Sequence, residues 1–394
     1  MAENLSNAGL DVTIAELSDH LIAPLDFDMA CLVHNYLRAK GIRLLLKTGV
    51  KGFTSAEHGI LAEIGETQHL FDFVVLSVGV RPESALAKDA GLKLNPKGAI
   101  LVDPQMLTSD ENIYAVGDAV EITNYVTGKA GYIPLAGPAN KQGRIAADNI
   151  CGVNRSYSGT QGSAVLKIFE MTVATTGLNE ATAIAAGFET EKVYVFPASH
   201  ASYYPGGQEL FLKLIFEKPG GKILGAEIVG FDGVDKRCDV IATAIRAGMT
   251  VFDLTELELC YAPPYSSAKD PVNMAGYVAE NVLLEKVKQF YWEDCEKLRQ
   301  DTDAVLLDVR TPYEFQHGAI DGALHIPVDV LREDLARLDK TKRIYVYCAS
   351  GQRSYLACRI LSQHGFDCCN LAGGYKLYAL VRSELAVSMT KTEF

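Results

Sequence analysis

The spacing of apolar residues changes twice along the chain and predicts three regions. Up to about residue 158, short apolar runs alternate with segments of helical spacing, such as residues 26–40, where Met29, Val33 and Leu37 share one face. Between residues 159 and 287, several strands follow one another before two helices. From residue 288 onward, strands and helices alternate again. This order predicts a fold of mixed α/β and α+β class.

Individual elements follow from the same pattern. The predicted strands are residues 11–16, 43–46, 61–64, 73–78, 113–116, 164–169, 192–196, 210–217, 222–229, 304–307 and 343–347. The predicted helices are residues 1–9, 26–40, 145–149, 235–247, 272–287 and 355–364, with a charged helix over 284–300 as a linker. Residues 73–78 and 113–116 are apolar runs, and we therefore expect both strands to be buried.

Length and composition narrow the class of protein. A chain of 394 residues is expected to form two or three domains. The net charge of −12 argues against general nucleic-acid binding, and no apolar run is long enough to span a membrane. The N-terminus lacks a secretory pattern. Nine cysteines without a CxxC pair or a metal-ligand spacing predict reduced thiols, no metal site and a cytoplasmic location.

The segment over residues 108–119 contains the first candidate site. Its predicted strand ends at Gly117 and Asp118, and ligands bind at this end of strands in open α/β sheets. Glycine permits a close approach of the backbone, and the aspartate can accept hydrogen bonds from a sugar hydroxyl. An aspartate that simply caps the next helix is an equally open interpretation.

Two other strand ends have a similar form. The strand over residues 11–16 ends in Glu16 and follows a helix, which is the order found after the glycine-rich turn of a dinucleotide-binding unit. Gly79 ends the strand over residues 73–78. A surface carboxylate at Glu16 and a simple turn at Gly79 are the alternatives.

Further along, residues 132–144 lead into a helix. Leu135 and Ala136 place backbone N–H groups where a helix N-terminus favours electron-rich partners. Asn140 and Arg144 are four residues apart and therefore share one helical face. The alternative is an ordinary polar face.

The most specific pattern surrounds Cys348. An apolar strand over residues 343–347 leads to this cysteine, four residues separate it from Arg353, and a helix follows. Loop N–H groups, the helix N-terminus and Arg353 are expected to stabilise a thiolate nucleophile. A phosphatase loop has five intervening residues, and the shorter loop suits a sulfane sulfur on the cysteine. A buried structural cysteine is the alternative.

Taken together, these motifs resemble the FAD- and NAD(P)H-dependent pyridine nucleotide-disulfide oxidoreductases, specifically CoA-disulfide reductases and NADH oxidases, followed by a rhodanese domain. The resemblance implies partial doubly wound NAD(P)H-binding (1–82) and FAD-binding (83–158) domains. It further implies an α+β dimerisation domain (159–287) and an α/β rhodanese-like domain (288–394). Asp308, Arg310, His317, Gly318 and Gly351 fall on rhodanese motifs.

The same resemblance implies roles for individual residues. FAD would contact Gly117, Asp118, Ala119, Leu135 and Ala136. NADH would contact Glu16 and Gly79, and the carboxylate of Glu16 would disfavour the 2′-phosphate of NADPH. The CoA substrate would contact Asn140 and Arg144. Cys348 and Arg353 would be catalytic in sulfur transfer.

Two tyrosine-rich segments mark the dimerisation domain, at residues 202–206 and 261–270. The resemblance implies a homodimer in which Tyr204 and Tyr265 reach the active site of the partner and donate hydrogen bonds to a thiolate leaving group. Interface aromatics without a catalytic role are the alternative.

The sequence departs from the family pattern in one respect. The first flavin-binding half, with its glycine-rich turn and redox-active cysteine, is not found. We therefore expect a chain that begins inside a longer protein, with apolar faces left exposed. Two other functional classes stay open: a sulfurtransferase on a dimerising scaffold without redox activity, and a non-catalytic binding module.

Overall fold

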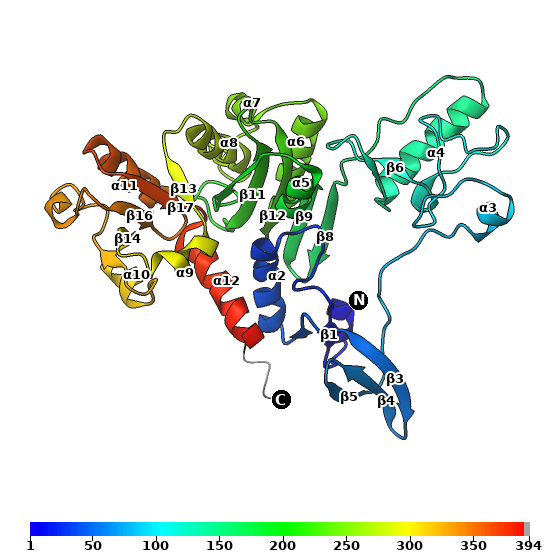
Figure 1. Ribbon diagram of the computed structural model, residues 1–394, viewed down its shortest axis with the longest axis horizontal. Coiled ribbons are helices and arrows are strands. Elements are labelled where there is room, and N and C mark those ends of the chain that lie inside the picture. Colours follow the sequence, from blue (N-terminus) through cyan, green and yellow to red (C-terminus); the bar gives the residue numbers. More distant parts are fainter. Residues whose placement is uncertain (390–394) are drawn as a thin grey trace. The chain divides into compact units, whose positions relative to one another are not determined.

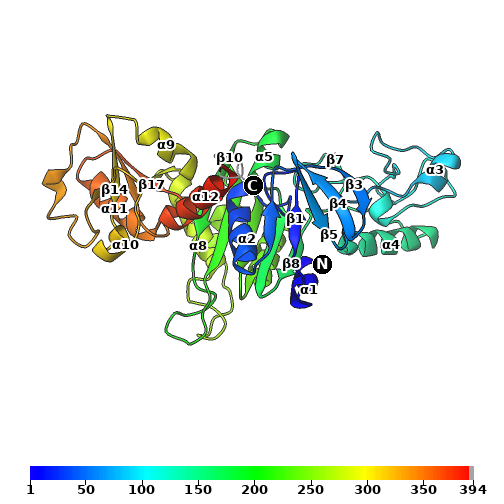
Figure 2. The same cartoon turned by 90° about the horizontal axis from the view of Figure 1, so that it is seen from below.

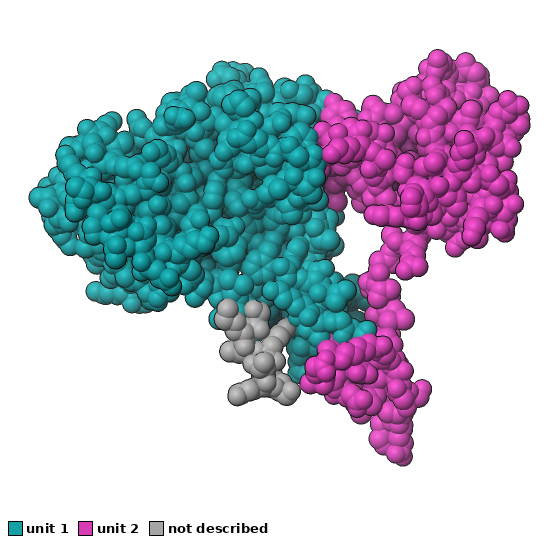
Figure 3. Space-filling model, viewed as in Figure 1, with its two compact units in different colours: residues 1–50, 165–174, 179–394 teal, residues 51–164, 175–178 magenta. Residues whose placement is uncertain are grey.

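The computed structural model describes residues 1–389 and the side chains of residues 1–387. The chain divides into two compact units (Figure 3). The larger unit contains residues 1–50, 165–174 and 179–394, and the smaller unit contains residues 51–164 and 175–178.

A five-stranded sheet forms the centre of the larger unit (Figure 1). Its strand order is β10-β11-β12-β9-β8. The strands are β8 (Ala164–Ile168), β9 (Met171–Gly177), β10 (Thr190–Val195), β11 (Leu210–Glu217) and β12 (Ile223–Gly230). The associated helices are α5 (Glu180–Ala186), α6 (Val234–Arg246), α7 (Val251–Glu256) and α8 (Pro271–Leu283). The sequence predicted four of these strands and two of the helices.

The N-terminal residues pack against this sheet. They form α1 (Ala2–Asn7), β1 (Thr13–Ala15), α2 (Phe27–Ala39) and β2 (Arg43–Leu45), and β1 pairs with β2 in parallel. The predicted apolar face of α2 is confirmed, because Met29, Val33 and Leu37 are buried in one core cluster with Val229 of β12. About 25 cal/mol per Å² of buried apolar area stabilises such a contact.

A buried charge cluster lies where α2 meets the sheet. Lys213 of β11 has no exposed surface, and its Nζ lies 2.8 Å from Asp26 Oδ2, 3.1 Å from Asp28 Oδ1 and 3.1 Å from Glu180 Oε2. Although burial raises it, hydrogen bonding to Glu227 and the charge of Lys213 bring the pKa of Asp26 down to about 2. Burial instead raises the pKa of Glu227 well above its ordinary value. Lys213 is therefore the central cation for several carboxyl groups.

The C-terminal region forms a second five-stranded sheet in which every pairing is parallel. Its order is β13-β17-β16-β14-β15. The strands are β13 (Lys288–Phe290), β14 (Ala304–Asp308), β15 (Leu324–His325), β16 (Arg343–Tyr347) and β17 (Cys368–Leu371). The helices are α9 (Cys295–Leu298), α10 (Pro312–Gln316), α11 (Gln352–Gln363) and α12 (Gly374–Met389), with 3-10 turns η2 (Trp292–Asp294) and η3 (Leu335–Arg337).

The predicted linker helix over residues 284–300 was wrong. Part of this segment is β13, which pairs with β17, and the rest contains only η2 and α9. An available sheet edge has overridden the helical propensity of the charged residues.

Helix α12 joins the C-terminal sheet to α2. At its start, Tyr375 N–H donates to Cys348 O at 2.8 Å and Lys376 N–H donates to Ala349 O at 3.0 Å. Farther along, Glu384 forms a bidentate ion pair with Arg38 of α2. The two helices lie side by side (Figures 1 and 2).

The smaller unit contains an antiparallel β-meander and a separate helical segment. The elements are β3 (Val50–Ala56), β4 (Gly59–Ile64), β5 (Thr67–Phe71), α3 (Ala85–Asp89), η1 (Gly117–Ala119), β6 (Ile122–Thr123), β7 (Ala130–Gly131) and α4 (Ala136–Ile150). Helix α4 begins nine residues before the predicted start of its helix.

Two strands predicted in this unit were wrong. Residues 73–84 form neither helix nor strand, and Leu76 and Val78 are 68% and 93% exposed. Residues 113–116 contribute only one isolated bridge, between Leu107 and Tyr114. An apolar run forms a buried strand only where neighbouring strands pair with it, and within residues 1–389 none pairs with residues 73–78.

Among the residues that the structure describes, no helix has both the length and the apolar character needed to cross a membrane.

Candidate functional site

The loop at Cys348 connects β16 to α11. Cys348 follows the last residue of β16 and is 1% exposed, while Gly351 caps α11 with a φ of 101°. Gly351 N–H donates to Cys348 Sγ at 3.2 Å, and Ser354 Oγ lies 3.3 Å from the same sulfur. Two donors and a helix N-terminus thus converge on the thiol, which is the arrangement that stabilises a sulfur anion.

Arg353 is close to this thiol, but a carboxylate occupies its guanidinium. Nη1 lies 2.7 Å from Glu314 Oε2, and Nη2 lies 2.6 Å from Glu314 Oε1. Arg353 holds the pKa of Glu314 down at about 2. Sequence reasoning missed Glu314, although the Thr311-to-Glu314 spacing of a helix capping box was visible.

A second arginine anchors the loop that follows β14. Arg310 is buried, its Nη2 lies 2.6 Å from Asp308 Oδ2, and the same atom donates to Gly318 O at 2.7 Å. Gly318 is required at this point, because a side chain there would collide with the Tyr375 hydroxyl. Asp308, Arg310 and Gly318 therefore shape the surroundings of Cys348. His317 is exposed, and its Nδ1 lies 2.8 Å from Tyr313 O.

Three buried thiols of the chain are poor nucleophiles. Burial raises the pKa of Cys238 and Cys295 to about 12, and that of Cys369 to about 11. These groups stay protonated at neutral pH, so Cys348 is a better candidate than they are for thiolate chemistry.

In the smaller unit, η1 packs against the first turns of α4. Gly117 has a φ of 78°, and its N–H donates to Gln142 Oε1 at 2.7 Å. Leu135 is the N-cap of α4 and Ala136 is its first residue. The structure therefore brings Gly117, Asp118 and Ala119 close to this helix. Gln142, which is 1% exposed, was not identified from the sequence.

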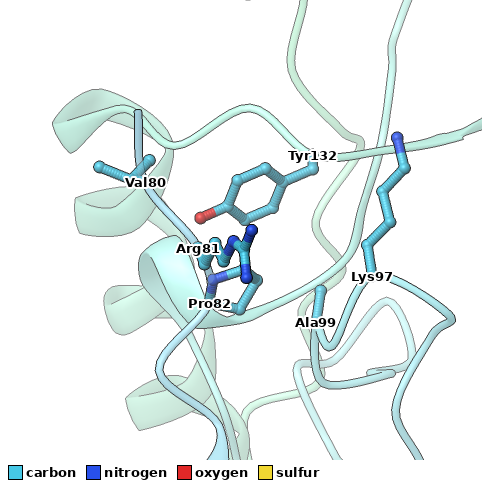
Figure 4. A pocket seen from close by; sticks show the side chains of 6 residues that line it. All are labelled: Val80, Arg81, Pro82, Lys97, Ala99 and Tyr132. Atoms are coloured by element: carbon cyan, nitrogen blue, oxygen red, sulfur yellow. The ribbon is translucent and has the colours of Figure 1, made fainter. Parts of the chain in front are cut away.

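The carboxylate of Asp118 is available to a ligand. Asp118 is exposed, and its side chain has no hydrogen-bond partner among the described residues. The hydroxyl of Tyr132 is buried without a partner, and burial and the charge of Asp118 raise the pKa of Tyr132. Tyr132 lines a cavity of about 350 Å³ with Val80, Arg81, Pro82, Lys97 and Ala99 (Figure 4).

These groups are suited to part of a nucleotide cofactor. An open carboxylate can accept hydrogen bonds from hydroxyls, an unpartnered phenol can donate one, and the two cations of the cavity can bind an anionic group. Arg81, Lys97 and Tyr132 had no sequence signal, because their proximity depends on the path of residues 79–99.

The remaining predicted residues have the following positions. Glu16 directly follows β1, and its Oε1 accepts from Ser18 N–H at 2.8 Å. Gly79 lies in the smaller unit within residues 73–84, which form neither helix nor strand. Asn140 and Arg144 are both exposed on α4, and Asn140 donates to Ala136 O at 2.9 Å.

Tyr204 and Tyr265 lie on two loops that extend together from the central sheet domain (Figure 2). They are 44% and 71% exposed, and the hydroxyls of Tyr203 and Tyr261 are 2.9 Å apart. Arg237, at the base of these loops, is buried.

Arg237 connects the two loops, which the sequence did not indicate. Its Nη2 donates to Ser199 O at 2.8 Å and lies 3.0 Å from Asp270 Oδ2.

Family comparisons cover most of the chain. Residues 1–143 match the pyridine nucleotide-disulphide oxidoreductases, residues 163–271 match the dimerisation domain of that family, and residues 292–380 match the rhodanese-like domain.

Two solved structures are similar over nearly the whole chain. The structure of reduced Bacillus anthracis CoADR-RHD is 44% identical, with 98% of this chain and 69% of that chain covered and a TM-score of 0.94. The NAD-dependent persulfide reductase from A. fulgidus is 41% identical, with coverages of 95% and 69% and a TM-score of 0.89.

Curated relatives agree with these structures. The coenzyme A disulfide reductase of Staphylococcus epidermidis is 34% identical over 282 residues, which are 71% of this chain and 63% of that protein. The chain spans less than two thirds of the length of the curated relatives it matches, such as the NADH oxidase of Methanocaldococcus jannaschii.

Proposed function

Because the chain belongs to the pyridine nucleotide-disulphide oxidoreductase family and has a rhodanese-like domain, we propose that it reduces disulfide or persulfide sulfur on coenzyme A and transfers sulfane sulfur at Cys348. This family is the one predicted from the sequence motifs. The observation that carries the proposal is the buried Cys348 sulfur, which faces the Gly351 N–H and the Ser354 hydroxyl.

Sulfur transfer proceeds in two steps. The Cys348 thiolate attacks the outer sulfur of a persulfide, the donor S–S bond breaks, and the donor leaves as a thiolate that takes up a proton. Cys348 then carries a persulfide, which an acceptor thiolate attacks at its outer sulfur, so that Cys348 leaves as a thiolate. The Gly351 N–H stabilises the negative charge on Cys348 sulfur in both steps.

The reductive part requires FAD and NAD(P)H. FAD, when bound, would supply the redox chemistry that links the nicotinamide to the sulfur substrate. Gly117, Asp118 and Ala119 would hold it, together with the backbone N–H groups near Leu135 and Ala136. Glu16 and Gly79 would contact NADH, and Asn140 and Arg144 would contact CoA.

A mass measurement tests the sulfur-transfer part of the proposal. We expect the purified chain, after incubation with polysulfide, to gain one sulfur atom on the peptide that contains Cys348. A non-catalytic binding module would gain none. A sulfurtransferase without redox activity would gain the sulfur but would not oxidise NADH, and the reductase relatives disfavour that alternative.

Asp118→Ala is expected to weaken FAD binding. Loss of one or two charge-assisted hydrogen bonds should raise the dissociation constant about tenfold or more, as measured by flavin fluorescence titration. The control is Asp89→Ala, which removes an exposed carboxylate of α3 in the same unit. Equal affinities of the Asp118 variant and the wild type would contradict the assignment.

Tyr204→Phe and Tyr265→Phe are expected to slow NADH oxidation with CoA disulfide by about tenfold each, because each removes a proton donor for the leaving thiolate. Tyr203→Phe removes a hydroxyl from the same loop and serves as the control. If all three variants turn over at the same rate, Tyr204 and Tyr265 have only a packing role.

The dimerisation domain suggests a homodimer. We propose that Tyr204 and Tyr265 belong to its interface. We place the protein in the cytoplasm, because all nine cysteines lie in the described part of the chain and are free thiols.

A further inference from the structure

The positive charge of Arg353, next to Cys348, is neutralised by the carboxylate of Glu314. Arg353 is the cation of the loop, and both of its terminal nitrogens contact Glu314 at 2.6–2.7 Å. Both side chains are about one third exposed, at 32% and 30%. A ligand that approaches Cys348 therefore meets an ion pair and not a free guanidinium.

Glu314 is also held in place by Thr311. Its Oε2 accepts from Thr311 N–H at 3.0 Å and from Thr311 Oγ1 at 2.8 Å, which completes the capping box of α10. The interaction with Arg353 keeps the pKa of Glu314 at about 2, so its carboxylate is ionised at neutral pH. The negative charge is thus fixed in position by a helix and an arginine.

Arg310 cannot take over the role of an anion-binding cation. Its Nε lies 3.0 Å from both carboxylate oxygens of Asp308, its Nη2 donates to Gly318 O, and it is 4% exposed. This guanidinium is bound to the protein itself. The Gly351 N–H and the Ser354 hydroxyl, which are neutral, lie within hydrogen-bond distance of the Cys348 sulfur. Arg353 also interacts with this thiol, but its guanidinium is paired with Glu314.

From this arrangement, we infer that Glu314 determines donor specificity: it cancels the charge of Arg353, so that Cys348 prefers alkyl persulfides to sulfur-donating dianions such as thiosulfate. The two neutral donors are sufficient for the single charge that develops on sulfur. A dianion would place two negative charges near a fixed carboxylate, and like charges in close contact at a partly desolvated site repel strongly. The inference rests on the proposed sulfur transfer at Cys348.

Glu314→Gln provides the test, because glutamine has nearly the same shape and also completes a capping box. The full chain is assayed with thiosulfate, a dianion, and with 2-hydroxyethyl persulfide, which ionises only to a monoanion. We expect the ratio of kcat/KM for thiosulfate to kcat/KM for the persulfide to rise about tenfold or more in the variant. Glu314→Asp, which retains the charge, should keep the ratio closer to the wild-type value.

The control is Glu333→Gln, which removes an exposed carboxylate elsewhere in the same domain and should leave the ratio as in the wild type. An unchanged ratio in Glu314→Gln, or an equal loss with both donors, would overturn the inference and leave Glu314 as a structural brace. A wild-type chain that accepts sulfur from neither donor, and forms no persulfide on Cys348, would overturn the proposed function itself.

Discussion

Replacement of Cys348 by serine is expected to reduce sulfur transfer by about a thousandfold or more, to the rate measured without enzyme. The serine hydroxyl remains protonated at neutral pH and does not form a persulfide, so both steps of the transfer lose their nucleophile. Cyanide can serve as the acceptor, with thiocyanate formation from polysulfide as the measured quantity. The variant should fold normally, because the oxygen can accept the same Gly351 N–H hydrogen bond.

Cys151→Ser is the matched control, since Cys151 is an exposed thiol of the smaller unit. This variant should transfer sulfur as the wild type does. Sulfur transfer that persists in Cys348→Ser would show that another group carries the sulfur, and the assignment of the loop would be wrong.

The second large effect concerns stability. Lys213→Met is expected to lower the free energy of unfolding by about 3–5 kcal/mol, because it leaves Asp26 and Asp28 without the cation that they share. Glu180 keeps a partner, since Lys192 Nζ lies 2.8 Å from its carboxylate. Urea denaturation followed by circular dichroism measures the loss.

Two further variants separate charge from packing. Lys297→Met removes an exposed lysine of α9 and should change stability by less than about 0.5 kcal/mol. Asp28→Asn added to Lys213→Met should recover part of the loss, because it removes one of the two buried carboxylate charges that have lost their cation. If Lys213→Met unfolds at the same urea concentration as the wild type, the cluster does not stabilise the packing of α2.

Elements that are determined by the pattern of neighbouring residues in the sequence could be predicted. The apolar run at Arg343–Tyr347 and the glycine-containing loop after it define β16, Cys348 and α11 almost without reference to the rest of the chain. Alternation likewise identified β11, although Lys213 within it gave no indication of its role. A lysine in an apolar strand is explained only by Asp26 and Asp28, which lie 187 and 185 residues away in sequence.

Other features depend on partners that local patterns cannot specify. Residues 73–78 have the composition of a buried strand but lie exposed, because no strand within residues 1–389 pairs with them. Residues 284–300 have helical composition, yet β13 forms because β17 presents an edge. The Glu314–Arg353 pair joins residues 39 apart, and only the folded loop shows that Arg353 is not free to bind an anion.

Helix α12 connects the Cys348 loop to α2. Gly374, at its first position, allows the backbone to approach the Cys348 and Ala349 carbonyls, where a side chain would come within 2.7 Å of both oxygens. Sixteen residues of helix span about 24 Å, and Glu384 near the far end is clamped to Arg38. One end of α12 is therefore bonded to the backbone of the Cys348 loop, and the other end is bonded to α2. The first fifty residues thus restrain this loop in addition to the sheet from which it extends.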